Sequence, residues 1–284
     1  MSLPNVSNAT PLPGPLTKAG TLSISIVVYR LDEAELALNL GTLQLACEQA
    51  ALTDVALTLI DNSEQGSQAR AMRELAERTG WPHAEVLSGR GNVGYGAGHN
   101  LPIRAAKTPA YLVLNPDVEL DANALRRGLE TLALPGVVLV GAVGRDGDGE
   151  PGYLSKRMPG VWTFFLRGFA PVWLKRRFDA QLAHYEYRDL PTDCLSDVVL
   201  VSGAFMLCRT DALRAVGGFD ERYFLHFEDL DLSLRLAQQG RIVSDPQVTL
   251  IHHGGNSASR GFAHLRVFVR SGLRFFNTHG WRLF

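Results

Sequence analysis

Short apolar runs alternate with amphipathic stretches in the first part of the chain. Residues 22–29 form an apolar, β-branched run that is typical of a strand covered on both faces, and residues 32–48 carry leucines at helical spacing. The same reasoning predicts strands over 55–60, 86–87 and 111–114, and helices over 68–78 and 101–106. This alternation predicts an α/β fold with an open, mostly parallel sheet, in which ligands bind at the carboxyl ends of the strands.

The second part of the chain has a more mixed pattern. It predicts helices over 121–132, 210–216 and 229–240, and strands over 137–143, 198–208 and 247–251, with a break at Ser202-Gly203. We expect one domain in two halves, residues 21–118 and 119–260. A flexible tail over 1–20 and an amphipathic helix over 261–284 are expected to flank it.

Composition narrows the class of protein. The chain has 284 residues, 46% of them hydrophobic, so it can bury a sizeable core. Lys and Arg total 28 against 29 Asp and Glu, and a net charge of -1 gives no reason to expect nucleic acid as the main partner. The three cysteines lie far apart, which argues against a disulfide framework or a zinc cluster. No apolar run reaches the ~18 residues of a transmembrane helix, so we expect a soluble or peripheral cytoplasmic protein.

Polar side chains follow three of the predicted strands. Asp61 ends one strand, the tripeptide Asn-Pro-Asp at 115–117 follows another, and His252-His253 follows the last. Carboxylates are preferred ligands of Mg²⁺ and Mn²⁺, often together with substrate phosphates. An ordinary turn at 115–117 and a surface histidine pair are the alternatives. Adjacent histidines cannot share one face of a strand, so at most one of them is expected to bind a metal.

Two other segments carry candidate chemistry. Residues 91–100 hold four glycines between a strand and a helix, where a nucleotide can approach the backbone; a purely structural loop is the alternative. The glycine spacing departs from that of a dinucleotide-binding loop. Glu228, Asp229 and Asp231 lie at the start of a predicted helix, after an apolar, glycine-rich segment. They fit either capping of the helix dipole or a partly enclosed pocket with a carboxylate as general base.

In this order the motifs resemble those of the family-two glycosyltransferases with the GT-A fold, and within them the bacterial rhamnosyltransferase-like branch. The resemblance runs from about residue 23 to residue 257. Its most specific parts are SGAFMLCRTDALRAVGGFDERYFLHFEDLDLSLRLAQQG, residues 202–240, and RGNVGYGAGHN, residues 90–100. It implies a Rossmann-like central sheet flanked by helices, with a nucleotide-sugar-binding half at 21–118 and a mixed, acceptor-binding and catalytic half at 119–260.

The resemblance also implies roles for the motif residues. Asp229 is the expected catalytic base, with Glu228 and Asp231 in support. Asp117 ends a D-x-D-type motif that begins here with Asn115, and is the expected ligand of Mg²⁺ or Mn²⁺. His252 is preferred to His253 as the second metal ligand. The residues expected to contact the nucleotide sugar are Val28, Tyr29, Asp61, Asn92, Gly94, Gly98, Asn100, Asn115 and Asp117.

These roles describe a metal-dependent sugar transfer with inversion. Asp229 would deprotonate an acceptor hydroxyl, which attacks the sugar opposite the leaving diphosphate. By analogy with the branch, dTDP-L-rhamnose is preferred as donor over UDP- or GDP-sugars. The acceptor is expected to be a cell-surface glycan, such as lipopolysaccharide, or a lipid-linked glycan.

Two alternatives from other classes stay open. One is a non-catalytic nucleotide-sugar or glycan-binding module on the same fold, against which the Glu228-Asp229 pair speaks. The other is a Rossmann oxidoreductase, which the lack of a G-x-G-x-x-G motif after the first strand disfavours.

Two basic, aromatic segments are candidates for contact with the acceptor or the inner membrane. Residues 155–178 hold six basic residues and no acidic one, and Arg266, Arg270 and Arg274 repeat every fourth position near the C-terminus. Such a helix is typical of peripheral contact with the cytoplasmic face of the inner membrane. A docked terminal helix with a solvated arginine edge fits the pattern equally well.

Overall fold

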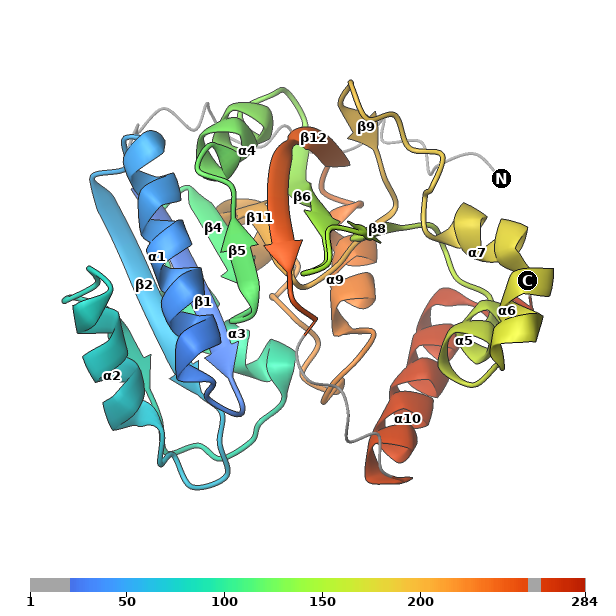
Figure 1. Ribbon diagram of the computed structural model, residues 1–284, viewed down its shortest axis with the longest axis horizontal. Coiled ribbons are helices and arrows are strands. Elements are labelled where there is room, and N and C mark those ends of the chain that lie inside the picture. The colour runs from blue at the N-terminus through green and yellow to red at the C-terminus, as the bar shows by residue number, and fades with distance from the viewer. Residues whose placement is uncertain (1–20, 255–261, 284) are drawn as a thin grey trace.

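Four parallel strands and three helices form the first half of the molecule. The computed structural model describes residues 21–254 and 262–283. The strands are β1 (Thr21–Val28), β2 (Asp54–Asp61), β3 (Glu85–Leu87) and β4 (Ala110–Leu114), in the order β3-β2-β1-β4. They are joined by α1 (Glu33–Gln49), α2 (Ala69–Arg78) and α3 (Tyr95–Ala105). All neighbouring pairs are parallel, which confirms the predicted sheet (Figure 1).

The second half extends the same sheet with strands of both directions. β11 (Phe205–Arg209) lies antiparallel between β4 and β6 (Val137–Arg145). β12 (Arg241–His252) runs parallel to β6, and β5 (Val118–Leu120) pairs antiparallel with β12. Shorter strands follow at the margin: β7 (Pro151–Gly152) pairs with β6, and β9 (Ser196–Asp197) pairs with β12. β8 (Ser155–Lys156) and β10 (Leu200–Val201) form a separate two-stranded sheet. One sheet therefore passes through both predicted halves.

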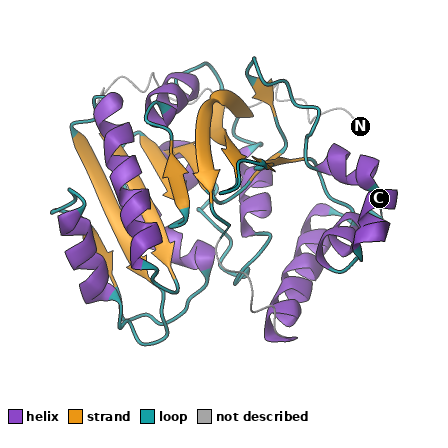
Figure 2. Cartoon of the chain, in the orientation of Figure 1, coloured by secondary structure: helices purple, strands orange, loops and turns teal. Residues whose placement is uncertain are grey.

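Helices cover both faces of this sheet (Figures 1 and 2). α1, α2 and α4 (Ala124–Leu132) lie on one face, and α3, α8 (Thr210–Ala215) and α9 (Glu228–Leu236) lie on the other. Alternate residues of β4 serve the two layers, since Leu112 and Leu114 belong to the core under α1, whereas Tyr111 and Val113 belong to the core under α3 and α9. A strand covered on both faces has to be apolar at successive positions, which explains the continuous hydrophobic run.

A further group of helices stands beside the sheet. α5 (Val161–Gly168), α6 (Val172–Arg177) and α7 (Asp179–Tyr185) pack against one another, and α10 (Phe262–His279) lies next to them (Figure 1). The ring centroid of Phe164 lies 4.6 Å from that of Phe227 and 6.0 Å from those of Phe268 and Phe276. This aromatic core joins the basic segment to the C-terminal helix. Among the described helices, none has the length and apolar character needed to span a bilayer.

Helix α3 begins at Tyr95, earlier than the predicted start at residue 101. The glycines in its first turns resemble a loop in the sequence, and close packing explains why they are there. A Cβ atom at Gly96 would lie 2.7 Å from Cβ of Phe219, and one at Gly98 would lie 2.8 Å from Cγ2 of Val27. These positions need glycine because the helix lies directly against its neighbours.

Other boundaries differ for a related reason. β12 begins at Arg241 rather than at 247, and its pairing with β6 is interrupted between Ser244 and Thr249. Polar residues in this interval break the hydrophobic pattern from which a strand is predicted. The pattern did not predict β5, the short strands β7, β8 and β9, or the helices α5, α6 and α7. The break at Ser202-Gly203 is confirmed, because it separates β10 from β11.

Candidate active site

The turn after β4 brings Asp117 close to His252. From α1, the side-chain amide of the fully buried Asn39 donates hydrogen bonds to the carbonyls of Asn115 (3.0 Å) and Val118 (2.7 Å), which hold the turn in place. Oδ1 of Asp117 lies 3.3 Å from Nε2 of His252, and Nδ2 of Asn115 lies 3.5 Å from the same nitrogen. The register explains this meeting, since His252 of β12 lies opposite Val118 of β5.

The two histidines point to different partners. His252 faces Asp117, whereas the ring of His253 makes a short contact with Glu119. The backbone N–H of His253 also donates to the carbonyl of Asp117 at 3.0 Å. Successive side chains of a strand project to opposite faces, so only one of them can reach Asp117. Of the two histidines, His252 is therefore the one beside Asp117, and its role as a metal ligand stays a prediction.

These side chains offer a small set of metal ligands. Within residues 21–254 and 262–283 there is no group of three or more His, Cys, Asp or Glu side chains arranged to hold a metal ion. Asp117 and His252 supply one carboxylate and one imidazole, beside the amide of Asn115. Mg²⁺ and Mn²⁺ commonly take one or two protein carboxylates and complete their shell with substrate phosphates and water. The set therefore fits a cation that is bound together with a diphosphate.

Asp61 lies at the carboxyl end of β2. It is 2% exposed and accepts hydrogen bonds from the backbone N–H groups of Ser63 and Gln68, both at 3.0 Å. Burial raises the pKa of Asp61, but the hydrogen bonds from Ser63 and Gln68 together outweigh it and hold the pKa below its usual value. Asp61 is therefore ionised at neutral pH.

Val28 is the last residue of β1 and Tyr29 follows it, and their side chains differ in exposure. The side chain of Val28 is buried, and its carbonyl accepts a hydrogen bond from the backbone N–H of Asn62 at 2.8 Å. Tyr29 is 43% exposed, and the guanidinium carbon of Arg30 lies 5.5 Å from its ring centroid. Of the two side chains, only that of Tyr29 is available to a ligand.

The loop before α3 is tied to the end of β2 and to the segment before α9. Asn62 donates to Oδ1 of Asn92 (3.1 Å) and to the carbonyl of Gly94 (3.2 Å). Gly94 has a φ of 93°, and a Cβ atom there would lie 2.4 Å from the carbonyl oxygen of Phe224. Only glycine fits this position, so the loop has one defined shape.

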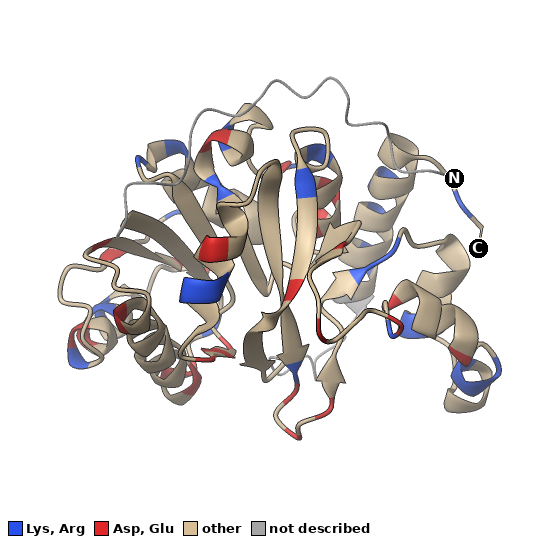
Figure 3. Cartoon of the chain, turned by 90° about the horizontal axis from the view of Figure 1, so that it is seen from above, with Lys and Arg blue, Asp and Glu red and all other residues tan. Residues whose placement is uncertain are grey.

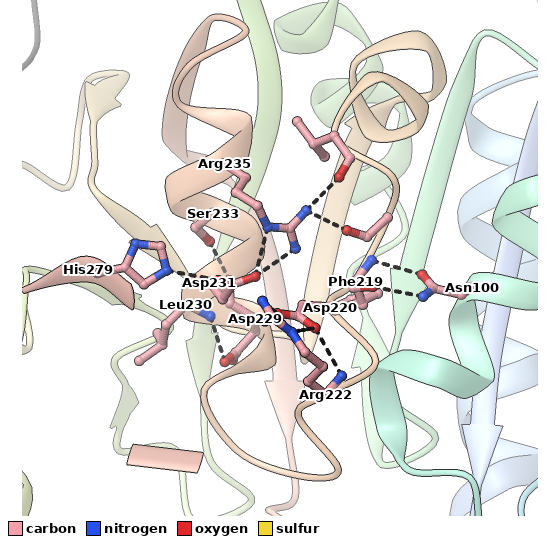
Figure 4. A network of polar contacts seen from close by, with 12 residues as sticks. Asn100, Phe219, Asp220, Arg222, Asp229, Leu230, Asp231, Ser233, Arg235 and His279 are labelled. Carbon is pink, nitrogen blue, oxygen red and sulfur yellow. Dashed lines mark hydrogen bonds and ion pairs between the residues drawn. The ribbon is translucent and has the colours of Figure 1, made fainter. Parts of the chain in front are cut away.

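Two residues expected in the nucleotide-facing loop serve packing instead. Gly98 lies inside α3 against Val27, as described above. Asn100 is 1% exposed, and its side-chain amide accepts from the backbone N–H and donates to the carbonyl of Phe219, both at 2.8 Å (Figure 4). Because these contacts use both ends of the buried amide, the expectation for Gly98 and Asn100 is corrected to a structural role.

The carboxylates of α9 follow a strained turn. His226 and Phe227 have φ values of 68° and 70°, a left-handed conformation that is costly for bulky residues and concentrates at functional sites. Directly after it, the half-buried Asp229 accepts hydrogen bonds from the backbone N–H groups of Gly203 and Leu230, both at 2.9 Å. The turn thus aims the first residues of α9 at the break between β10 and β11.

The same break connects Asp229 to the turn after β4. The backbone N–H of Asn115 donates to the carbonyl of Ala204 at 3.0 Å, and Ala204 follows the glycine that binds Asp229. Tyr95, which the sequence analysis did not single out, donates its hydroxyl to the carbonyl of Gly203 at 2.7 Å. The motifs around Asn115 and Asp229 therefore meet at one edge of the sheet.

Acidic side chains on both sides of Tyr95 affect the pKa of its phenol. Burial raises the pKa of Tyr95 well above its usual value, and the charges of Glu228, Asp229 and Asp117 raise it further. Its phenol therefore stays neutral and stands among all three carboxylates. A single aromatic residue within a run of small ones was the only signal in the sequence.

Glu228 and Asp229 form a coupled acidic pair. Burial, together with the charge of Asp229, raises the pKa of Glu228 well above its usual value. Burial also raises the pKa of Asp229, but the N–H groups of Gly203 and Leu230 oppose this shift. The pKa of both carboxyl groups is thus raised, and the rise is larger at Glu228, which leaves Asp229 as the member of the pair that ionises more readily.

Asp231 lies on another side of α9 and anchors the helix. It is 2% exposed and binds Nε of Arg235 and Nε2 of His279, both at 2.8 Å (Figure 4). Arg235 in turn donates to the carbonyls of Val216 (2.8 Å) and Gly218 (2.7 Å). The support that Asp231 provides is thus positional, because these contacts join α9 to α10 and to the segment after α8.

The central, mostly parallel sheet with helices on both faces is the GT-A fold, which solved glycosyltransferase structures share. The family model described as “Glycosyl transferase family 2” matches residues 33–216, and the chain belongs to this family. The protein is therefore an enzyme, a glycosyltransferase. The oxidoreductase and the non-catalytic module are set aside.

Relatives assign the chain to the rhamnosyltransferase-like branch. N-acetylglucosaminyl-diphospho-decaprenol L-rhamnosyltransferase of Mycobacterium tuberculosis (strain CDC 1551 / Oshkosh) is 30% identical over 252 residues, which cover 82% of this chain and 76% of that protein. O-antigen biosynthesis protein RfbC of Myxococcus xanthus is 44% identical over 61 residues, 21% of this chain and 5% of that protein.

Two solved structures share the fold. GalNAc-T7 with UDP, GalNAc and Mn²⁺ superposes with a TM-score of 0.61 at 13% identity, over 92% of this chain and 48% of that chain. Mannosyltransferase PcManGT from Pyrobaculum calidifontis, in complex with GDP-Man and Mn²⁺, superposes with a TM-score of 0.61 at 14% identity, over 95% of this chain and 66% of that chain. At these identities the likeness concerns the fold.

Proposed function

We propose that this glycosyltransferase moves L-rhamnose from dTDP-L-rhamnose to a hydroxyl of a lipid-linked or cell-surface glycan, with inversion and with the help of a divalent cation. The observation that carries the proposal is the meeting of Asp117, Glu228 and Asp229 around Tyr95. The rhamnosyltransferase relative supports the choice of sugar, and the O-antigen biosynthesis relative supports a polysaccharide product. A UDP-sugar is the alternative donor, since one structural neighbour was solved with UDP.

The donor binds along the carboxyl ends of β1 and β2. Tyr29 and the backbone at Val28 contact the base, Asp61 contacts the ribose, and the loop at Asn92 and Gly94 closes against the nucleotide. Support comes from the exposed ring of Tyr29 and from the rigid attachment of the loop through Asn62. In open α/β sheets this edge is the usual place for a ligand.

Asp117 and His252, with Asn115 beside them, hold the cation. A bound Mg²⁺ or Mn²⁺ supplies positive charge to the diphosphate of the donor, which stabilises the charge that develops as it leaves. Both structural neighbours were solved with Mn²⁺, which supports a divalent cation at this site.

Asp229 is the catalytic base. It takes the proton of the acceptor hydroxyl as the oxygen attacks the anomeric carbon, and the bond from that carbon to the diphosphate breaks on the opposite side. One displacement of this kind inverts the anomeric centre. The pKa of Glu228 is raised further than that of Asp229, so Asp229 is the member of the pair that loses its proton first.

The outer side of α10 contacts the membrane that carries the acceptor. Arg266 and Arg270 of this helix are exposed, as are Val269 (46%) and Leu273 (48%), and Lys and Arg recur on this side of the molecule (Figure 3). Apolar and basic side chains on one exposed face fit an anionic lipid surface, such as the cytoplasmic face of the inner membrane.

A screen of nucleotide sugars tests the function. We expect dTDP-L-rhamnose with Mn²⁺ or Mg²⁺ to raise the melting temperature more than UDP- or GDP-sugars, since a ligand at about 100 times its Kd stabilises the native state by about 2.7 kcal/mol. Release of dTDP in the presence of a lipid-linked glycan confirms turnover. Selective stabilisation by another nucleotide sugar, or equal stabilisation with chelator present, would contradict the donor or the metal.

A further inference from the structure

A buried lysine lies beside the proposed catalytic base. Lys156, in β8, is 8% exposed, and its Nζ lies 5.8 Å from the ring centroid of Tyr153 and 5.5 Å from that of Tyr185. Among the residues that the structure describes, no hydrogen bond or ion pair reaches this nitrogen. Burying an ammonium group without an anion is costly, so a lysine in this position is suited to an anionic ligand.

Backbone pairing links Lys156 to Asp229. β8 and β10 place Lys156 opposite Leu200. The next contact along this pair is a hydrogen bond of 2.8 Å from the backbone N–H of Ser202 to the carbonyl of Leu154, and the residue after Ser202 is Gly203, whose N–H binds Asp229. The strand that carries the lysine is therefore joined directly to the segment that binds the base, and the charge of Asp229 acts on Lys156.

Other cations gather around the lysine. Arg167 lies 3.8 Å from Glu186, and Arg188 lies 2.7 Å from Glu186 and 2.8 Å from Asp179. Glu186 is thus paired with the two arginines, and Asp229 is the other carboxylate whose charge acts on Lys156. Burial, with the charge of Arg167, lowers the pKa of Lys156 to about 7, and a bound anion would restore its full charge.

We propose that Lys156, with Arg167 beside it, binds a phosphate of the acceptor, a sugar joined to its lipid through a diphosphate. The proposal rests on the proposed function, because it takes Asp229 as the base. When the reacting hydroxyl lies over Asp229, the diphosphate on the anomeric carbon of the same sugar is one ring away, and Lys156 is a buried amine near that base. The tuberculosis relative, whose name specifies a sugar-diphosphate-lipid acceptor, is consistent with this chemistry.

Binding of acceptor analogues tests the proposal without donor or turnover. The full chain is titrated calorimetrically with N-acetylglucosaminyl diphosphate on a short alkyl chain, and with the uncharged alkyl glycoside of the same sugar. Variants are Lys156→Met, Lys156→Arg, and the matched control Lys107→Met. Lys107 is an exposed lysine just before β4, at the opposite end of that strand from Asn115.

We expect Lys156→Met to weaken binding of the diphosphate roughly 10- to 100-fold, as loss of a charged hydrogen bond does, and to leave the uncharged glycoside unaffected. Lys156→Arg should recover most of the affinity, and Lys107→Met should match the wild type. A wild type that does not prefer the diphosphate, or a Lys156→Met variant that loses both ligands equally or loses dTDP instead, would overturn the proposal. If dTDP-L-rhamnose is not the donor, only the transfer assay is affected, because the titration contains no donor. Failure of the proposed function is thus distinguishable from failure of the Lys156 proposal.

Discussion

Glu228 and Asp229 are adjacent in the chain, and their different partners give them different properties. Asp229 accepts two backbone N–H groups, whereas Oε2 of Glu228 is buried with no hydrogen-bond partner among the described residues. Hydrogen bonds to the ionised form favour it, and burial without them favours the protonated form. A single helical turn therefore holds two carboxyl groups with different hydrogen bonding, and the pKa is raised further at Glu228 than at Asp229.

Replacing the base tests its role. We expect Asp229→Asn to lower kcat roughly 100-fold or more, because the amide cannot take the hydroxyl proton. Binding of the donor, measured by the shift in melting temperature that it causes, should change little, since the donor lies on the side of Asp117. Turnover close to that of the wild type would remove Asp229 from the role of base.

Replacing Glu228 tests the buried proton through stability. The unfolded chain loses this proton at a lower pH than the native protein does, so the native state loses stability as the pH rises above the ordinary Glu range. Glu228→Gln lacks this loss. Relative to the wild type, its free energy of unfolding should rise with pH above the ordinary Glu range, by up to about 1.4 kcal/mol per pH unit, measured by urea unfolding. A stability difference that does not change with pH would contradict a raised pKa.

At the scale of elements, α10 has two distinct faces. Its inner face is docked: Phe275 and Phe276 are buried, and the hydroxyl of Ser271 donates to the carbonyl of Leu225 at 2.8 Å. Its outer face exposes Val269 and Leu273. The docked helix that the sequence analysis allowed is thus present, and docking leaves the opposite face open to a lipid surface.

Vesicle binding tests the outer face of α10. We expect Arg266→Gln with Arg270→Gln to weaken binding to anionic vesicles roughly 10- to 30-fold at low salt, since each basic residue near such a surface contributes about 1 kcal/mol. The control is Arg70→Gln with Arg73→Gln on α2, two exposed arginines on the far side of the sheet (Figure 1). Equal losses in both pairs, or no binding by the wild type, would contradict a specific docking face.

At the scale of the whole molecule, one sheet unites the donor half and the acceptor half. β11 follows β10 in the second half but pairs with β4 of the first half, and so brings Gly203 and Ala204 beside Asn115. Tyr95 reaches across from α3 to the same segment. The site therefore depends on contacts between residues that are far apart in the chain.

The sequence by itself determined the first half of the fold and the positions of the acidic motifs. Strands joined by helices are predicted by local hydrophobic periodicity. The turn formers at 115–117 indicate a turn, and the carboxylates at the start of α9 indicate a helix start. Tertiary structure decided the rest. The insertion of β11, the packing role of Gly98 and Asn100, and the burial of Lys156 beside Asp229 all depend on long-range contacts, which leave no periodic trace in the chain.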